Sequence, residues 1–154
     1  MPPVSPRALV RKLRRLGGRG ALDLIDAQRA LLRARRALRT RPRGDLLRAV
    51  PDRADPSAAT TPADFHRLDR IAVSVRRASD YGLFRPTCLV RAIALEDLAH
   101  RHGILRSVVR VGVRRRGGAF EAHAWLELEG RVVGDTAEHV ADFTVLDDFS
   151  SLTG

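Results

Sequence analysis

Residues 85–135 read RPTCLVRAIALEDLAHRHGILRSVVRVGVRRRGGAFEAHAWLELEGRVVGD. Up to Gly103 the apolar side chains recur every three or four residues, which is typical of a helix with one buried face. After Gly103 the period changes to two, which is typical of strands. We therefore expect the following elements: a helix over 88–102 with Gly103 as its C′ residue, a strand over 105–115, a turn at Gly117-Gly118 and a strand over 120–129.

The residues before this stretch predict further helices. Apolar spacing predicts one helix over 7–16 and a longer one over 21–38, with the glycines of 17–20 ending the first of them. Residues 61–64 (TPAD) combine a capping Thr, a Pro and an acidic side chain, which favours the start of a helix. That helix should run to about Ser79.

A helical half followed by a small antiparallel sheet indicates an α+β fold. The sheet should gain a third strand over 131–135. We divide the chain into a basic helical extension, residues 1–60, and a core, residues 61–154, which together should form one compact unit. The structure of residues 136–154 stays open at this stage.

The composition excludes several classes of protein. The 154 residues suit about one domain, and 44% hydrophobic with 30% charged residues is not the composition of a disordered chain. No apolar run approaches the roughly 18 residues of a membrane span, and no secretory signal is visible. One cysteine excludes an intramolecular disulfide and, without histidines beside it, a zinc cluster. We expect a cytoplasmic protein with no metal and no cofactor.

The net charge of +10 favours encounter with acidic partners. Of the 28 basic residues only Lys12 is a lysine, a skew that indicates GC-rich codon usage more than selection for one ligand. No aromatic side chain lies among the basic residues of the first 50 positions, where a single-strand binder would place its stacking surfaces. A basic nucleic-acid-binding module without catalysis is therefore the least favoured reading.

Cys88 is predicted to lie in the first turn of a helix, because Pro86 interrupts the preceding segment and Thr87 is a suitable N-cap. Unpaired backbone N–H groups and the helix dipole favour a thiolate at such a position. The N–H of Cys88 itself could donate to an oxyanion. The alternative is that Cys88 is a small buried hydrophobic residue.

His123 projects from the interior of the strand over 120–129, and its partner depends on the register of the next strand. A two-residue loop, 129–130, would pair Ala124 with Asp135 and face Asp135 away from His123. A three-residue loop, 128–130, with a type I turn and a bulge would pair His123 with Asp135. We expect the three-residue loop, which would let Asp135 orient the imidazole. The alternative is a polar pair without catalytic use.

The remaining histidines show no metal-binding spacing. His66 lies in a polar part of a helix, His100 and His102 lie near a helix C-terminus, and His139 lies in the unassigned tail. The combination that indicates chemistry is a single cysteine, a strand histidine and an aspartate, in the order Cys88, His123, Asp135.

In their combination, several segments resemble the leader peptidases of lasso-peptide biosynthesis, which are transglutaminase-like, papain-related cysteine proteases. The matching segments are RPTCLVRAIAL at 85–95, GI at 103–104, VGV at 111–113, FEAHAWLE at 120–127, Gly130 and Asp135. The resemblance covers about residues 65–135. It implies that Cys88 is the nucleophile, His123 the general base and Asp135 its orienter, and that the enzyme hydrolyses the leader–core peptide bond of a ribosomally made precursor.

The resemblance also implies partners. The precursor peptide would be held by a separate leader-recognition protein, since the first 60 residues lack the strands of a winged-helix recognition domain. An ATP-dependent lasso cyclase would act on the freed core. The basic N-terminal helices would form the docking surface for that protein or contact the leader; alternatively, they are ordinary solvated faces. An acyl-transferring transglutaminase-like enzyme or amidase with the same triad is the main alternative activity.

Two details stay open. Papain-related proteases commonly carry a Gln before the cysteine as a second oxyanion donor, and this chain has none there, so Arg85, Thr87 or a backbone N–H would have to serve. Trp125 shares a face with His123 and is either a shield of the His–Asp contact or part of the core.

Overall fold

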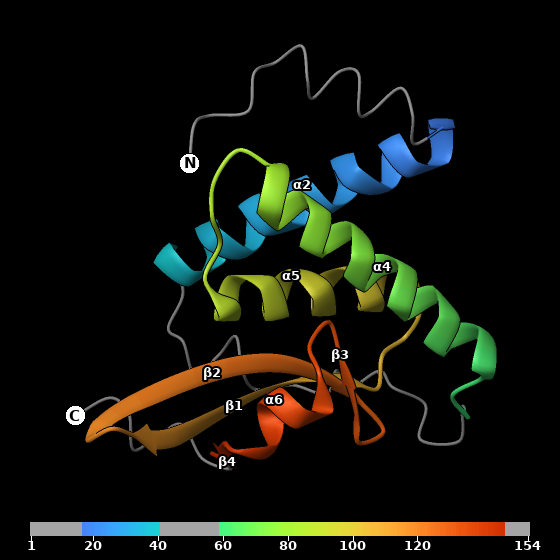
Figure 1. Cartoon of the computed structure of the whole chain (residues 1–154). Helices are drawn as coiled ribbons and strands as arrows, with labels where there is room; N and C mark the ends of the chain where they lie inside the picture. The colour runs from blue at the N-terminus through green and yellow to red at the C-terminus, as the bar shows by residue number, and fades with distance from the viewer. Residues whose placement is uncertain (1–16, 41–58, 147–154) are drawn as a thin grey trace.

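The computed structural model describes residues 17–40 and 59–146. Two helices lie over a third, which in turn lies on one face of a four-stranded antiparallel sheet, while a short helix lies under the sheet (Figure 1). The elements are α2 (Gly17–Thr40), α4 (Pro62–Tyr81), α5 (Cys88–Arg101), β1 (Ser107–Arg116), β2 (Ala119–Leu128), β3 (Arg131–Val133), α6 (Ala137–Ala141) and β4 (Thr144–Val145). This is the α+β architecture that the sequence predicts.

Helix α5 is the centre of the molecule. It packs against α2 and α4 on one side and against β1 and β2 on the other, so apolar residues occupy most of its circumference. Thr87 caps its start by accepting the Val90 N–H at 3.4 Å. Gly103 has a φ of +81° and Ile104 N–H donates to the Ala99 carbonyl at 2.9 Å, which confirms Gly103 as the C′ residue.

Helix α4 begins with a complete capping box. The Thr61 hydroxyl accepts the Asp64 N–H at 3.3 Å, and Asp64 accepts the Thr61 N–H at 2.9 Å. The Thr61 backbone and side-chain hydrogen bonds hold the pKa of Asp64 below its usual value. The predicted start of this helix is confirmed.

Helix α2 begins earlier than predicted. Residues 17–20, expected to end a preceding helix, form its first turn instead. A glycine costs only about 1 kcal/mol in a helix, which the packing of the later turns offsets. The buried face of α2, made of Ala27, Ala30, Leu31 and Ala34, belongs to the same core cluster as α5. The helix expected over 7–16 lies outside the described residues, and the division at residue 60 stays a prediction.

The sheet has the strand order β3-β2-β1-β4. Arg116 pairs with Ala119 across Gly117 and Gly118, both with positive φ, which confirms the predicted hairpin. The tail contributes β4, which pairs with β1 at Gly112.

The loop between β2 and β3 differs from the prediction. Leu128 pairs with Arg131, so the loop is Glu129-Gly130 and the three-residue loop is wrong. Both loop residues have positive φ (+50° and +80°), as in a type I′ turn, whose twist matches that of the flanking strands. Thr60 donates a hydrogen bond to the Glu129 side chain at 2.7 Å and helps to hold this backbone. Strand β3 also ends at Val133, two residues earlier than expected.

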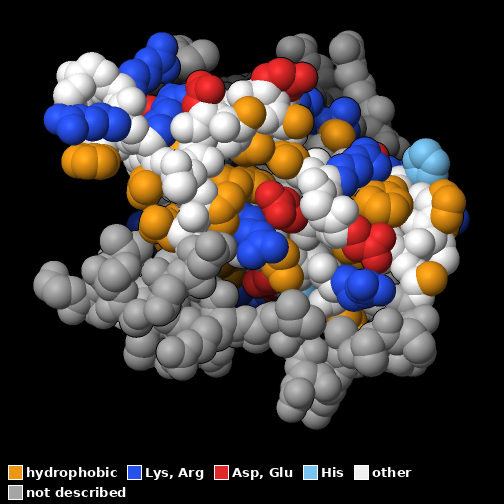
Figure 2. Space-filling model, turned by 90° about the horizontal axis from the view of Figure 1, so that it is seen from below, with side chains coloured by type: hydrophobic (Ala, Val, Ile, Leu, Met, Phe, Trp, Pro, Cys, Tyr) orange, Lys and Arg blue, Asp and Glu red, His pale blue; other side chains and the backbone are white. Residues whose placement is uncertain are grey.

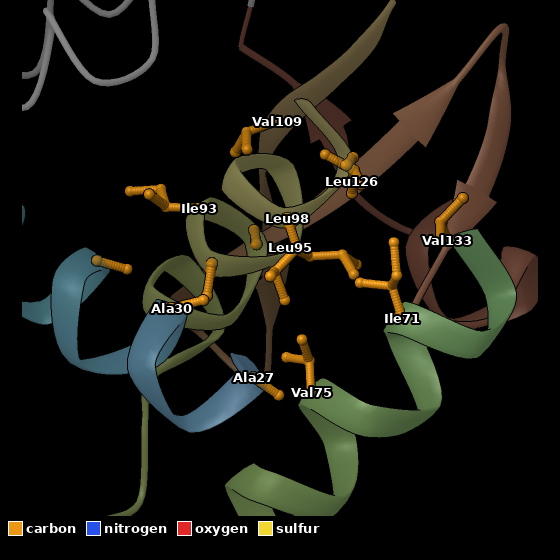
Figure 3. Packing of buried hydrophobic residues seen from close by; sticks show 14 of the residues in the cluster. Ala27, Ala30, Ile71, Val75, Ile93, Leu95, Leu98, Val109, Leu126 and Val133 are labelled. Carbon is orange, nitrogen blue, oxygen red and sulfur yellow. The ribbon is translucent and has the colours of Figure 1, made fainter. Parts of the chain in front are cut away.

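The main core lies between the helices and the upper face of the sheet, where side chains from α2, α4, α5 and the strands converge (Figure 3). A second, smaller cluster of Trp125, Val140 and Phe143 covers the lower face of the sheet. In the parts of the chain that the structure describes, no helix is both long and apolar enough to cross a membrane.

Candidate active site

Cys88 is the first residue of α5 and is partly buried. At this position its backbone N–H has no acceptor within the helix. The residue lines a small cavity of about 30 Å³ between α4, α5, β2 and the turn after β3. The polar residues of this cavity are Arg76, Cys88, Arg91 and Asp135. Cys88 is thus at the predicted helix start, with part of its surface accessible.

His123 and Asp135 form a direct contact. Nε2 of His123 lies 2.6 Å from Oδ2 of Asp135, and the two side chains are 12% and 21% exposed. The second oxygen of Asp135 accepts the Thr136 N–H at 2.8 Å. A carboxylate held at both oxygens is well suited to fix the orientation of an imidazole.

This contact arises by a different route from the predicted one. With the two-residue loop, strand alternation would face Asp135 away from His123. The alternation stops at Val133, however, because Gly134 adopts a φ of +77°. This left-handed residue redirects the chain and brings Asp135 back to His123.

The contact shows which ring nitrogen of His123 donates a hydrogen bond and which can accept one. A carboxylate only accepts hydrogen bonds, so Nε2 carries the proton that is donated to Asp135. In the neutral ring Nδ1 is then an acceptor, available to take a proton from another group.

Aromatic rings surround His123. Its ring centroid lies 4.8 Å from that of His139, 5.3 Å from that of Phe143 and 6.1 Å from that of Trp125. Trp125 is buried in the lower cluster, as the prediction of a core residue requires, and its ring stacks near His123; its role as a shield of the His–Asp contact stays a prediction. Gly112, opposite His123 on β1, leaves room for these rings, since a Cβ there would lie 2.8 Å from Cβ of Phe143.

The structure does not join Cys88 to His123. Cys88 packs against the main core on the helix side of the sheet. The His123 ring contacts Trp125, His139 and Phe143, two of which form the lower cluster. Among the described residues the Cys88 thiol has no hydrogen bond, so the arrangement contains an oriented His–Asp pair and a separate thiol that shares a cavity with Asp135.

His139 is a neighbour of this site that the sequence analysis left in the unassigned tail. Thr136 caps the short helix α6 by accepting the His139 N–H at 3.2 Å, and this cap was a readable signal. Donor atoms of His123, Asp135 and His139 lie within 4.8 Å of one another. Two imidazoles and a carboxylate are ligands that suit a divalent transition metal. In this structure, however, His123 and Asp135 bind each other.

Arg91 is a second residue that the sequence analysis passed over. It lies three positions after Cys88 on α5 and lines the same cavity. Residues three apart share a helix face, and this spacing was the available signal. Thr87, one of the proposed oxyanion donors, uses its hydroxyl oxygen to cap α5.

Comparison with known proteins identifies the family. Residues 8–148 match the transglutaminase-like superfamily, and the chain belongs to it. This superfamily contains cysteine-dependent enzymes, among them peptidases and acyltransferases. No curated protein and no solved structure matches the chain.

Proposed function

We propose that the protein is a cysteine peptidase that hydrolyses the leader–core bond of a lasso-peptide precursor, with Cys88 as nucleophile, His123 as base and Asp135 as orienter. The observation that carries the proposal is the 2.6 Å contact between His123 and Asp135, which leaves Nδ1 available. Cys88 at the start of α5 and the superfamily membership support it.

In the first half of the reaction, Nδ1 of His123 takes the proton of the Cys88 thiol, and the sulfur attacks the carbonyl carbon of the scissile bond. The negative charge moves to the carbonyl oxygen, which accepts the backbone N–H of Cys88. Collapse of this intermediate breaks the C–N bond. His123 gives its proton to the departing amine, which is the new N-terminus of the core.

In the second half, water attacks the thioester that joins the leader to Cys88, and His123 accepts a proton from it. The C–S bond breaks, the leader leaves with a new carboxylate, and the thiol regains its proton. The step requires Sγ of Cys88 to approach Nδ1 of His123. Because the two side chains pack on different sides of the sheet, this approach requires a rearrangement. We propose that the free chain already samples it, so that His123 activates the thiol before the precursor binds, and that the bound precursor stabilises it.

The partners in this proposal are the precursor peptide, a separate leader-recognition protein and an ATP-dependent cyclase that uses the core. The exposed arginines of α2, such as Arg36 and Arg39, offer a docking surface for them. The compartment that we propose is the reducing cytoplasm, in keeping with a free thiol nucleophile.

The test is incubation of the chain with a precursor peptide and its leader-recognition protein, followed by mass spectrometry. We expect two fragments whose masses sum to the precursor plus one water. Cys88→Ala, His123→Ala and Asp135→Ala should leave the precursor intact, whereas His66→Ala, an exposed histidine of α4, should cleave it normally. An active Cys88→Ala variant would contradict the proposal.

The same experiment separates the alternatives. With an added primary amine, an acyl-transferring enzyme would give a leader fragment that carries the amine in place of water. A basic binding module would leave the precursor whole and would bind nucleic acid with strong salt dependence, even as the Cys88→Ala variant.

A further inference from the structure

We propose that Arg76 and Arg91 form an anion-binding subsite beside Cys88, which takes a side-chain carboxylate of the peptide substrate. The inference rests on the proposed function only for the identity of the substrate as a peptide. The subsite itself follows from the cavity that both arginines line together with Cys88.

Two helices bring these arginines to one cavity. Arg91 follows Cys88 by three positions on α5, and Arg76 belongs to α4. Side chains of a helix lean toward its N-terminus, so Arg91 extends over the turn that holds Cys88. Both residues line the cavity that Cys88 lines. A group that reaches the sulfur through this cavity therefore passes residues that carry two positive charges.

Neither arginine has an ion-pair partner among the described residues. On the underside of the molecule, by contrast, basic and acidic side chains lie next to one another (Figure 2). Several other arginines also bind carboxylates: Arg33 binds Asp97 at 2.6 Å, Arg114 binds Glu121 at 2.7 Å and Arg131 binds Asp69 at 2.8 Å.

Asp135 is the carboxylate of the same cavity, and neither arginine forms an ion pair with it. One of its oxygens contacts His123 and the other accepts the Thr136 N–H. The remaining wall includes Ala72, Val75 and Leu95, which offer no counter-charge. Two arginines that line one cavity, with no ion-pair partner there, favour the binding of an anion. The start of α5 adds a favourable dipole.

The chemistry and size of the cavity define the ligand. A volume of about 30 Å³ suits one small polar group. A carboxylate matches the guanidinium groups in charge and geometry. The preferred substrate is therefore a peptide with an aspartate or glutamate next to the bond that Cys88 attacks.

The test compares two alkylating reagents that differ in charge. Iodoacetate carries a carboxylate and iodoacetamide does not, and both require the same thiolate. The rate with iodoacetate divided by the rate with iodoacetamide therefore does not depend on how much thiolate is present. This ratio reports only how strongly the protein attracts the anionic reagent. A free cysteine derivative supplies the reference ratio, and circular dichroism checks the fold of each variant.

We expect the wild-type ratio to exceed the reference ratio by about fivefold, the effect of one or two charges within a few ångströms at the protein surface. Arg91→Met and Arg76→Met keep the apolar stem and should each lower the ratio, while Arg91→Lys should preserve most of it. The matched control is Arg116→Met, at the exposed end of β1, which should leave the ratio unchanged.

Three outcomes would overturn the proposed subsite. The first is a wild-type ratio equal to the reference ratio, and the second is a ratio that neither Met variant changes. The third is a native thiol that reacts with neither reagent. The His123→Ala variant separates this inference from the proposed function. If His123 activates the thiol, both rates fall in that variant and their ratio stays high. If His123 does not activate the thiol, both rates in His123→Ala equal those of the wild type, and the ratio still measures the effect of the two arginines.

Protection of Cys88 from iodoacetamide identifies the source of the carboxylate. N-acetylglutamate amide carries only a side-chain carboxylate, and N-acetylalanine carries only a C-terminal one. We expect the glutamate derivative to protect the thiol in the wild type and not in Arg91→Met. Protection by N-acetylalanine alone would overturn the assignment to a side-chain carboxylate.

Discussion

At Asp135 the position of one carboxylate depends on the backbone of the residue before it. Gly134 adopts a φ of +77°, and an added Cβ would also lie 2.9 Å from Cδ2 of Leu95. Both features exclude a side chain here without rearrangement. The pairing of His123 with Asp135 is therefore encoded in the glycine as well as in the two polar residues.

Gly134→Ala should destabilise the fold by about 1–3 kcal/mol and should also separate Asp135 from His123, because strain and overlap act together. The measurement is thermal unfolding together with precursor cleavage below the transition. Gly103→Ala is the matched control, since its φ is +81° but no atom lies within 4 Å of the added Cβ. Equal cleavage by the two variants would contradict this role of Gly134.

Glu96 is the other residue whose position has a measurable consequence. It lies on α5 and accepts the Val109 N–H of β1 at 3.1 Å. Burial raises the pKa of Glu96 to about 7, although the hydrogen bond from Val109 opposes the shift. The folded protein thus prefers the neutral carboxyl group, whereas the unfolded chain ionises near the usual value of 4.5.

The sign of the pH effect follows. Because the folded pKa is raised, the contribution of Glu96 to stability is fully present below about pH 4.5 and is lost as the pH rises to about 7. Glu96→Gln keeps an acceptor for Val109 and has no charge to bury. Its advantage in free energy of unfolding over the wild type should grow across this window, to roughly 3 kcal/mol above it. Denaturant unfolding at a series of pH values measures it, and a constant difference would contradict the assignment.

At the scale of elements, the start of α5 determines what Cys88 can do. Thr87 accepts the Val90 N–H and fixes the first turn, which leaves the N–H of Cys88 for a ligand. The sequence predicted this cap and the end of α5 at Gly103, since both depend on local residue types. The hairpin at Gly117-Gly118 was predictable for the same reason.

Thr87→Ala should cost about 1 kcal/mol of stability and should loosen the turn that carries Cys88. Thr87→Ser keeps the hydroxyl and is the matched control. Hydrogen exchange of the α5 amides and the alkylation rate of Cys88 measure the effect. If Thr87→Ala matches Thr87→Ser in both measurements, the cap does not organise this turn.

The register of β2 with β3 shows where prediction from the sequence failed. The residues around Glu129 allow a two-residue or a three-residue loop, and the choice depends on whether a glutamate adopts positive φ. Residues other than glycine rarely adopt positive φ, so local preference argues against the two-residue loop. The hydrogen bond from Thr60, which is distant in the sequence, helps to hold Glu129 in this conformation. His139 and β4 escaped prediction because the tail has no clear period. Contacts with distant residues order them: the residues beside His139 pack under the sheet, and β4 pairs with the edge of β1.

At the scale of the molecule, helices α2, α4 and α5 share one main core with the strands. Leu31 of α2 is fully buried, in the same cluster as residues of α5 and β2. The division expected at residue 60 stays a prediction, and it marks where the resemblance to the protease family begins. The α+β class was predictable because it requires only the order of helices and strands.

Leu31→Ala should destabilise the whole chain by about 2–5 kcal/mol in a single transition, because it opens a cavity in the shared core. Leu22→Ala, on the exposed side of α2 at 62% exposure, should change stability little. Denaturant unfolding followed by the fluorescence of Trp125 measures both. A separately folding extension would instead leave the Trp125 transition of Leu31→Ala unchanged.

The central claim is that Cys88, His123 and Asp135 act as one catalytic group, and the alkylation of Cys88 by iodoacetamide at about pH 7 tests it most directly. The measurement needs no substrate and compares the native wild type with His123→Ala and His66→Ala. We predict that the rate falls about tenfold or more in His123→Ala and stays unchanged in His66→Ala. An equal rate in a folded His123→Ala variant, or a wild-type thiol that reacts only after denaturation, would contradict the account.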